Sequence, residues 1–101
     1  MTPRLVLASS PVSVEERYGA FAGAGSTEPS FGLLCLAAVA RQTGAEVAVV
    51  ESSARSLDLT AALREVLAFN PDVVGVTATT SEIVRAGELA ARVKQVRPGI
   101  L

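Results

Sequence analysis

The stretch "NPDVVGVTATTSE", residues 70–82, combines a turn, a buried strand and the start of a helix. Asn70-Pro71-Asp72 is typical of a turn, and the apolar run that follows predicts a strand over 72–77 that is covered on both faces. Four hydroxyl residues then occur within five positions: Thr77, Thr79, Thr80 and Ser81. Because they lie where a strand should pass into a helix, they either cap that helix or line a ligand site.

The spacing within this stretch divides the hydroxyls between these two roles. Thr79 is followed three residues later by Glu82, which is the pattern of a capping box. A helix cap needs only one hydroxyl, and Thr79 with Glu82 is the best candidate for it. Thr77 and Thr80 therefore remain as the candidates for contact with a ligand.

Strands and helices alternate through the rest of the sequence. The patterns predict strands at 4–8, 46–52 and 72–77, helices at 29–44, 58–69 and 80–99, and the first two residues of a fourth strand at 100–101. This alternation is typical of right-handed βαβ units on a parallel sheet. Because the sequence stops as a strand begins, we expect residues 1–101 to be one domain at the N-terminus of a larger protein.

In a doubly wound parallel sheet, ligands bind beyond the carboxyl ends of the strands. Here that edge should bring together Ser9 and Ser10, Glu51 and Ser52, and residues 77–81. The preceding segment, 9–29, shows no clear period and is expected to be a long loop, either solvated or folded over a ligand as a lid. Its glycines lack the tight strand–helix turn and the Lys-Ser/Thr of nucleotide-binding motifs.

Composition narrows the possible functions. Half of the 101 residues are apolar, 19% are charged and the net charge is −1, which predicts a globular fold without a basic surface for nucleic acid. The chain has one cysteine and no histidine, so a disulfide framework, a CxxC site and imidazole chemistry are excluded. No signal peptide and no apolar run of membrane-spanning length is present, and a cytoplasmic location is expected.

The single cysteine, Cys35, lies in a predicted helix that is apolar nearly all round between Phe31 and Ala40. A thiol in such a helix is expected to be buried and inert. One face of this helix should pack on the sheet, and the opposite face should be covered by the long loop or by another domain.

Two long segments resemble a known family. "RYGAFAGAGSTEPSFGLLCLAAVARQTGAEVAVVES" (17–52) and "NPDVVGVTATTSEIVRAGELAARVKQVRPGI" (70–100) are similar to the N-terminal cobalamin (B12)-binding domain of cobalamin-dependent radical S-adenosylmethionine enzymes. Among these, the sequence most resembles the anaerobic magnesium-protoporphyrin IX monomethyl ester oxidative cyclase.

The resemblance implies a flavodoxin-like (Rossmann-like) α/β fold with three layers, α/β/α, and strand order 2-1-3-4-5, here truncated at strand 4. It implies cobalamin over the carboxyl edge of the sheet, with Ser9, Ser10, Thr77, Thr79 and Thr80 as cofactor-binding candidates. The iron–sulfur cluster and S-adenosylmethionine would belong to a downstream domain, which would be the partner of this one. The chain alone is then not expected to catalyse a reaction, and without histidine it cannot ligate cobalt through imidazole.

Two other functions stay open on the sequence. A flavodoxin-like domain without cofactor could bind another domain, or form a homodimer, through helix 31–40 or the unfinished edge of the sheet. A nucleotide or flavin module is the third interpretation. The sequence does not indicate the substrate of a parent enzyme.

Overall fold

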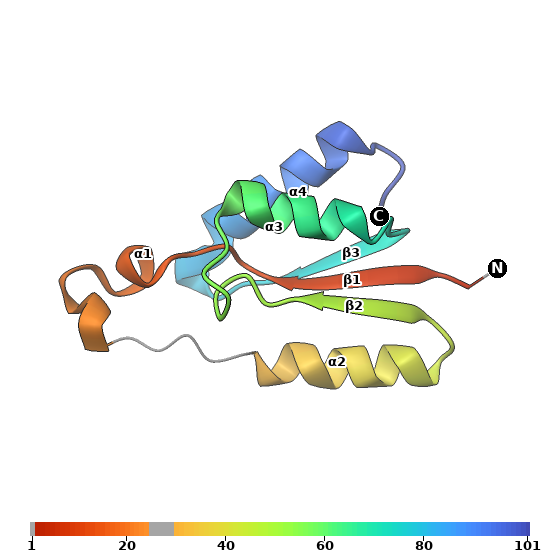
Figure 1. The fold of residues 1–101 in the computed structure, drawn as a ribbon, viewed down its shortest axis with the longest axis horizontal. Coiled ribbons are helices and arrows are strands. Elements are labelled where there is room, and N and C mark those ends of the chain that lie inside the picture. Colours follow the sequence, from red (N-terminus) through yellow and green to blue (C-terminus); the bar gives the residue numbers. More distant parts are fainter. Residues whose placement is uncertain (1, 25–29) are drawn as a thin grey trace.

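The computed structural model describes residues 2–24 and 30–101, and in this part of the chain a small parallel sheet lies between helices (Figure 1). The elements in chain order are β1 (Arg4–Ser9), α1 (Val14–Tyr18), η1 (Gly19–Ala24), α2 (Phe31–Gln42), β2 (Glu46–Val50), α3 (Leu59–Ala68), β3 (Val73–Thr77), η2 (Thr80–Glu82) and α4 (Ile83–Val96).

The three strands are parallel and lie in the order β2-β1-β3. α2 covers one face of the sheet, and α3 and α4 cover the other (Figure 1). The prediction of a flavodoxin-like, three-layer α/β fold with strand order 2-1-3 is therefore confirmed. Because β1 is central, it pairs with strands on both sides, through Arg4–Ala8 with β2 and through Leu5–Ser9 with β3.

The core follows from the alternation of side chains along the strands. Val6 and Ala8 of β1 are fully buried against α3 and α4, whereas Leu7 points to the opposite face and packs on α2. The helix predicted at 58–69 is confirmed as α3, and its Ala62 and Val66 face the core. Apolar side chains are thus buried on both faces of the sheet, which explains why the strands are nearly continuous apolar runs in the sequence.

The segment predicted as a long loop contains a short helix. Ser13 accepts a hydrogen bond from the Glu16 N–H at 3.0 Å, and the Glu16 carboxylate accepts one from the Ser13 N–H at 3.4 Å. This reciprocal cap stabilises the five-residue α1, and η1 follows it directly. The prediction of a loop was therefore wrong over 14–24, because helices this short carry no apolar period; residues 25–29 lie outside the described part.

The backbone of Leu101 pairs with β3. The Leu101 N–H donates to the Asp72 carbonyl at 3.2 Å, and the Val74 N–H donates to the Leu101 carbonyl at 2.8 Å. Two such bonds from one residue to positions two apart are the pattern of a parallel ladder. Residues 100–101 thus lie where the first residues of a fourth strand were predicted, although no strand is assigned there.

α2 buries only one stripe of its surface. Leu33 and Ala37 pack on the sheet, whereas Cys35 is exposed and Phe31 is 82% exposed. The prediction that Cys35 is buried was wrong, because α2 lies alone on its face of the sheet and nothing else in the described ranges covers its outer side. Within those ranges, no helix has both the length and the apolar character needed to cross a membrane.

Candidate functional site

The ends of β1 and β3 meet at one edge of the sheet. Ser9 is the register partner of Thr77, so the two hydroxyl residues that close these strands are neighbours in the sheet. The chain leaves β1 toward β2 on one side and reaches β3 on the other. This reversal is the switch point at which doubly wound sheets bind ligands, and the five predicted site residues all end these two strands or follow them within three positions.

Ser9 and Ser10 are buried and already hydrogen-bonded. The Ser10 hydroxyl donates to the Glu82 carbonyl at 3.0 Å, and the Ser9 hydroxyl accepts from the Ser53 N–H at 3.3 Å. Their exposed fractions are 1% and 7%. These two serines therefore hold the end of β1 against the start of α4 and against the β2–α3 loop.

Replacing Ser10 by alanine is expected to lower the free energy of unfolding by about 0.5–1.5 kcal/mol. The change removes the buried hydrogen bond that the Ser10 hydroxyl donates to the Glu82 carbonyl, and one net hydrogen bond contributes about this much. Urea unfolding followed by circular dichroism measures the change. Ser81→Ala, at an exposed position of η2, is the control and should change stability by less than about 0.5 kcal/mol.

The three threonines after β3 differ in what they bind. The Thr79 N–H donates to the Glu82 carboxylate at 3.0 Å, as the predicted cap requires, and the Thr79 and Ser81 hydroxyls lie 3.2 Å apart. Thr77 and Thr80 are exposed, and their hydroxyls make no hydrogen bond to another residue that the structure describes. Thr77 and Thr80 are thus the hydroxyls available to a ligand.

One face of β3 next to Thr77 is only partly covered. Side-chain alternation puts Gly75 and Thr77 on the α2 side of the sheet, where Leu7 also lies. α2 packs on β2 and β1, and β3 stays half-buried. A Cβ on Gly75 would come within 3.0 Å of the Leu7 side chain, so glycine at this position makes room for Leu7 of the neighbouring strand.

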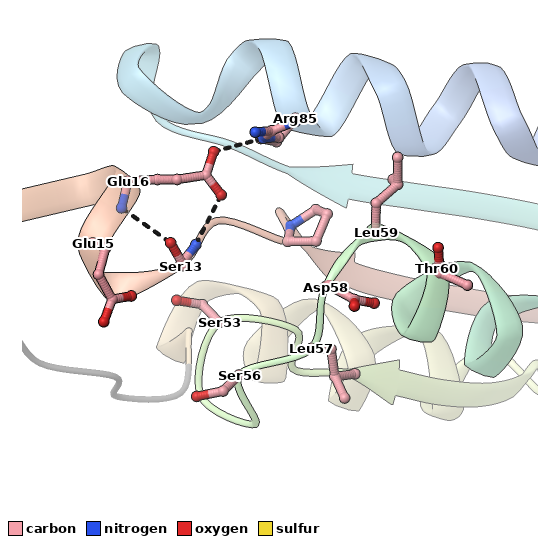
Figure 2. A pocket seen from close by; sticks show the side chains of 11 residues that line it. Ser13, Glu15, Glu16, Ser53, Ser56, Leu57, Asp58, Leu59, Thr60 and Arg85 are labelled. Atoms are coloured by element: carbon pink, nitrogen blue, oxygen red, sulfur yellow. Dashed lines mark hydrogen bonds and ion pairs between the residues drawn. The ribbon is translucent and has the colours of Figure 1, made fainter.

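A cleft of about 610 Å³ opens on the other side of the edge, between α1, the β2–α3 loop and the starts of α3 and α4 (Figure 2). Hydroxyls, carboxylates and one guanidinium line most of it. The lining residues are Pro11, Ser13, Glu15, Glu16, Ser53, Ser56, Leu57, Asp58, Leu59, Thr60 and Arg85. Its volume is in the range of small-molecule sites, and Ser53 connects it to Ser9 of the strand edge.

An ion pair joins α1 to α4 across this cleft. Figure 2 shows Glu16 reaching toward Arg85, and the Arg85 Nε donates to the Glu16 carboxylate at 2.6 Å. Arg85 also pairs with Glu88 at 3.0 Å. The hydrogen bond from Arg85 lowers the pKa of Glu16 below its ordinary value, because the guanidinium favours the ionised carboxylate.

The Glu16–Arg85 pair should therefore stabilise the fold at neutral pH and lose this effect in acid. A carboxyl with a lowered folded pKa contributes stability above its unfolded pKa and loses it as the pH falls through the folded value. We expect Glu16→Gln to be slightly less stable than the unchanged protein at pH 7 and equally stable below the folded pKa of Glu16. Urea unfolding between pH 7 and 3 measures this difference, with Glu15→Gln as the control that leaves the ion pair intact.

Glu51, at the end of β2, is half-buried, and its carboxylate accepts a hydrogen bond from the Ser30 N–H at 3.4 Å. It thus places a negative charge at the start of α2, where a phosphate would otherwise be favoured. This arrangement agrees with the lack of a phosphate-binding motif there. No three His, Cys, Asp or Glu side chains in the described residues gather so that they could hold a metal ion.

Several residues of the cleft were not predicted. Ser53, Ser56 and Asp58 precede α3, and Arg85 comes from α4. The local signal for α1 was present as Ser13 followed three residues later by Glu16. No local signal exists for a pair such as Glu16 and Arg85, which lie 69 positions apart.

Comparison with known proteins gives the cofactor class. The model of the B12 binding domain family matches residues 19–101, which include both helical layers and two of the three strands. Comparisons with curated proteins and with solved structures each give no significant match. With its parallel sheet in the order 2-1-3 and a polar edge at the switch point, the chain belongs to the B12 binding domain family and is a cobalamin-binding domain.

Proposed function

We propose that this domain holds cobalamin for a radical S-adenosylmethionine enzyme similar to the anaerobic magnesium-protoporphyrin IX monomethyl ester oxidative cyclase. The family match supports the cobalamin-binding part of this proposal. The two long segments at 17–52 and 70–100 support the class of the parent enzyme by their resemblance. The iron–sulfur cluster and S-adenosylmethionine would be held by a separate domain, so the domain described here binds but does not catalyse.

The five candidate residues would serve this function in two ways. Thr77 and Thr80 would donate to and accept from the amides and phosphate of cobalamin, because their hydroxyls are exposed and not used within the described structure. Ser9 and Ser10 would hold the carboxyl end of β1 in position through their own hydrogen bonds. Thr79 would hold η2 in place.

The residues at the edge fit cobalamin in size and chemistry. The face of β3 beside Thr77 is only half-buried, since α2 packs on β1 and β2, which leaves room for a bulky ring system, and the hydroxyls can pair with neutral amides. When bound, cobalamin supplies cobalt-centred chemistry to the reaction of the parent enzyme. Because the chain has no histidine, its contribution is to bind and orient the cofactor without an imidazole ligand to cobalt.

The observation that carries this proposal is a pair of exposed threonine hydroxyls, bonded to none of the residues that the structure describes, at the switch point of a B12-family domain. The test is a titration with hydroxocobalamin, followed by the absorbance of the corrin and by retention of colour after gel filtration. A saturable spectral shift is expected. Cobinamide, which lacks the nucleotide tail, should bind more weakly if the threonines contact that tail. A chain that is folded by circular dichroism and yet gives no shift and keeps no colour contradicts cobalamin binding at this edge.

The gene sequence provides a separate test of the class of the parent enzyme. The reading frame around this chain should encode a Cys-x₃-Cys-x₂-Cys motif, the ligands of an iron–sulfur cluster. A gene that contains only a cobalamin-binding domain, or one followed by a different catalytic domain, would contradict the radical enzyme and leave cobalamin binding unaffected.

A further inference from the structure

The cleft beside α1 and the exposed threonines after β3 belong to the same edge of the sheet. The Ser53 N–H, which lies in the wall of the cleft, donates to the Ser9 hydroxyl at 3.3 Å, and Ser9 is the register partner of Thr77. The end of β1 therefore lies between the cleft and Thr77. Because neighbouring strands are about 4.8 Å apart, a ligand that contacts Thr77 and is wider than about 10 Å reaches the cleft. Cobalamin is such a ligand, and the rim of its corrin ring carries primary amide side chains.

The charges of the cleft that are not compensated by an opposite charge are carboxylates (Figure 2). Arg85, the one cation among its described lining residues, is already bonded to Glu16 at 2.6 Å and to Glu88 at 3.0 Å. The Glu15 carboxylate has no hydrogen bond or ion pair with the residues that the structure describes. Asp58 uses one carboxylate oxygen to cap α3, and its other oxygen is open. The cleft therefore attracts hydrogen-bond donors and repels negative charge.

We propose that this cleft receives a peripheral amide side chain of the corrin and makes the domain selective for amidated corrinoids over those that carry a carboxylate at that position. This selectivity rests on the proposed function, since it requires cobalamin bound at Thr77. A primary amide donates two N–H groups and has no net charge, so the open oxygens of Glu15 and Asp58 and the serine hydroxyls of the cleft can accept from it. A carboxylate has no N–H to donate, and in a cleft of this size its charge would lie within about one Debye length of both acidic residues.

Charge, and not shape, provides this selectivity. An amide and a carboxylate have nearly the same size, so a cleft of about 610 Å³ does not separate them by fit. Glu15 and Asp58 are both exposed, so water and salt weaken their repulsion of a carboxylate. The expected difference in affinity is therefore moderate, about 5- to 30-fold at low salt.

Equilibrium dialysis of the 101-residue chain with cyanocobalamin and with its monocarboxylic acids tests the proposal. In each acid, one peripheral amide has been hydrolysed to a carboxylate, and the corrin absorbance gives the dissociation constants. At about 50 mM salt and pH 7, at least one of the acids should bind about fivefold or more weakly than cyanocobalamin. At about 1 M salt this ratio should fall below about twofold, because screening removes the repulsion. A ratio that salt leaves unchanged would overturn selection by charge.

The double variant Glu15→Gln with Asp58→Asn identifies the residues that carry the selectivity. It removes both charges, and asparagine caps a helix about as well as aspartate, so α3 should still begin at the same position. The ratio for the same acid should fall below about twofold at low salt. Glu46→Gln with Asp72→Asn is the matched control, because it removes the same charge at the amino ends of β2 and β3, and it should leave the ratio unchanged.

The outcomes separate this selectivity from cobalamin binding itself. Equal affinities for cyanocobalamin and all of the acids, or tighter binding of the acids, would overturn the selectivity while cobalamin binding stands. A low-salt ratio that the Glu15 and Asp58 double variant keeps, in a protein folded by circular dichroism, would overturn it as well. Absence of cyanocobalamin binding would contradict the proposed function, and the selectivity with it.

Discussion

Replacing Leu89 by alanine is expected to lower the free energy of unfolding by about 2–5 kcal/mol. Leu89 projects from α4 into the cluster formed with Val6 and Val66 and is completely buried. Truncation removes buried methyl groups and leaves a cavity that the surrounding side chains fill only in part. Domains of this size have a total stability of roughly 5–15 kcal/mol, so this single change should remove a large fraction of the stability.

Urea unfolding followed by circular dichroism at 222 nm measures the effect of this change. Val84→Ala is the control on the same helix, because Val84 is 68% exposed, and it should alter stability by less than about 0.5 kcal/mol. A loss below 1 kcal/mol for Leu89→Ala would show that α4 does not pack on the sheet as described.

Removing the hydroxyls of Thr77 and Thr80 together, as Thr77→Val with Thr80→Val, is expected to weaken hydroxocobalamin binding by about 5- to 100-fold. Valine keeps the shape of threonine and removes its hydrogen-bonding group, and each net hydrogen bond contributes about 0.5–1.5 kcal/mol. Because both positions are exposed, the fold should not change. The corrin absorbance titration gives the two dissociation constants.

Thr43→Val is the matched control for this variant. Thr43 ends α2 at the opposite end of the sheet from Thr77, and its hydroxyl donates to the Ala40 carbonyl at 2.7 Å. The control should bind cobalamin with unchanged affinity even if its stability falls slightly. An unchanged affinity in the double variant would show that cobalamin contacts other residues of the edge.

The sequence predicted the order of the main elements because each one carries a strong local pattern. The apolar runs of the strands and the period of 58–69 depend only on near neighbours, and a parallel sheet then limits the topology to a few choices. α1 was not predicted, since five residues are too few to show a helical period. The exposure of Cys35 was not predicted either, because burial depends on what covers a helix and not on the helix alone.

The candidate site was predicted as a set of residues and not as a geometry. Parallel strands end at one edge, so Ser9 and Thr77 could be expected to be neighbours from the strand assignment. Which hydroxyls are already hydrogen-bonded could not be predicted, because the Ser10–Glu82 bond joins positions 72 apart. The structure thus distinguishes serines that hold the edge in place from threonines that a ligand can reach.

The central position of β1 has a consequence for how this protein is made. β1 leaves the ribosome first, yet its second partner, β3, follows roughly 70 residues later, which is about 4–14 seconds at ordinary rates of translation. During that interval an apolar strand that will be buried on both faces has at least one open edge. Nascent chains of this protein should therefore be substrates for chaperones until β3 has emerged.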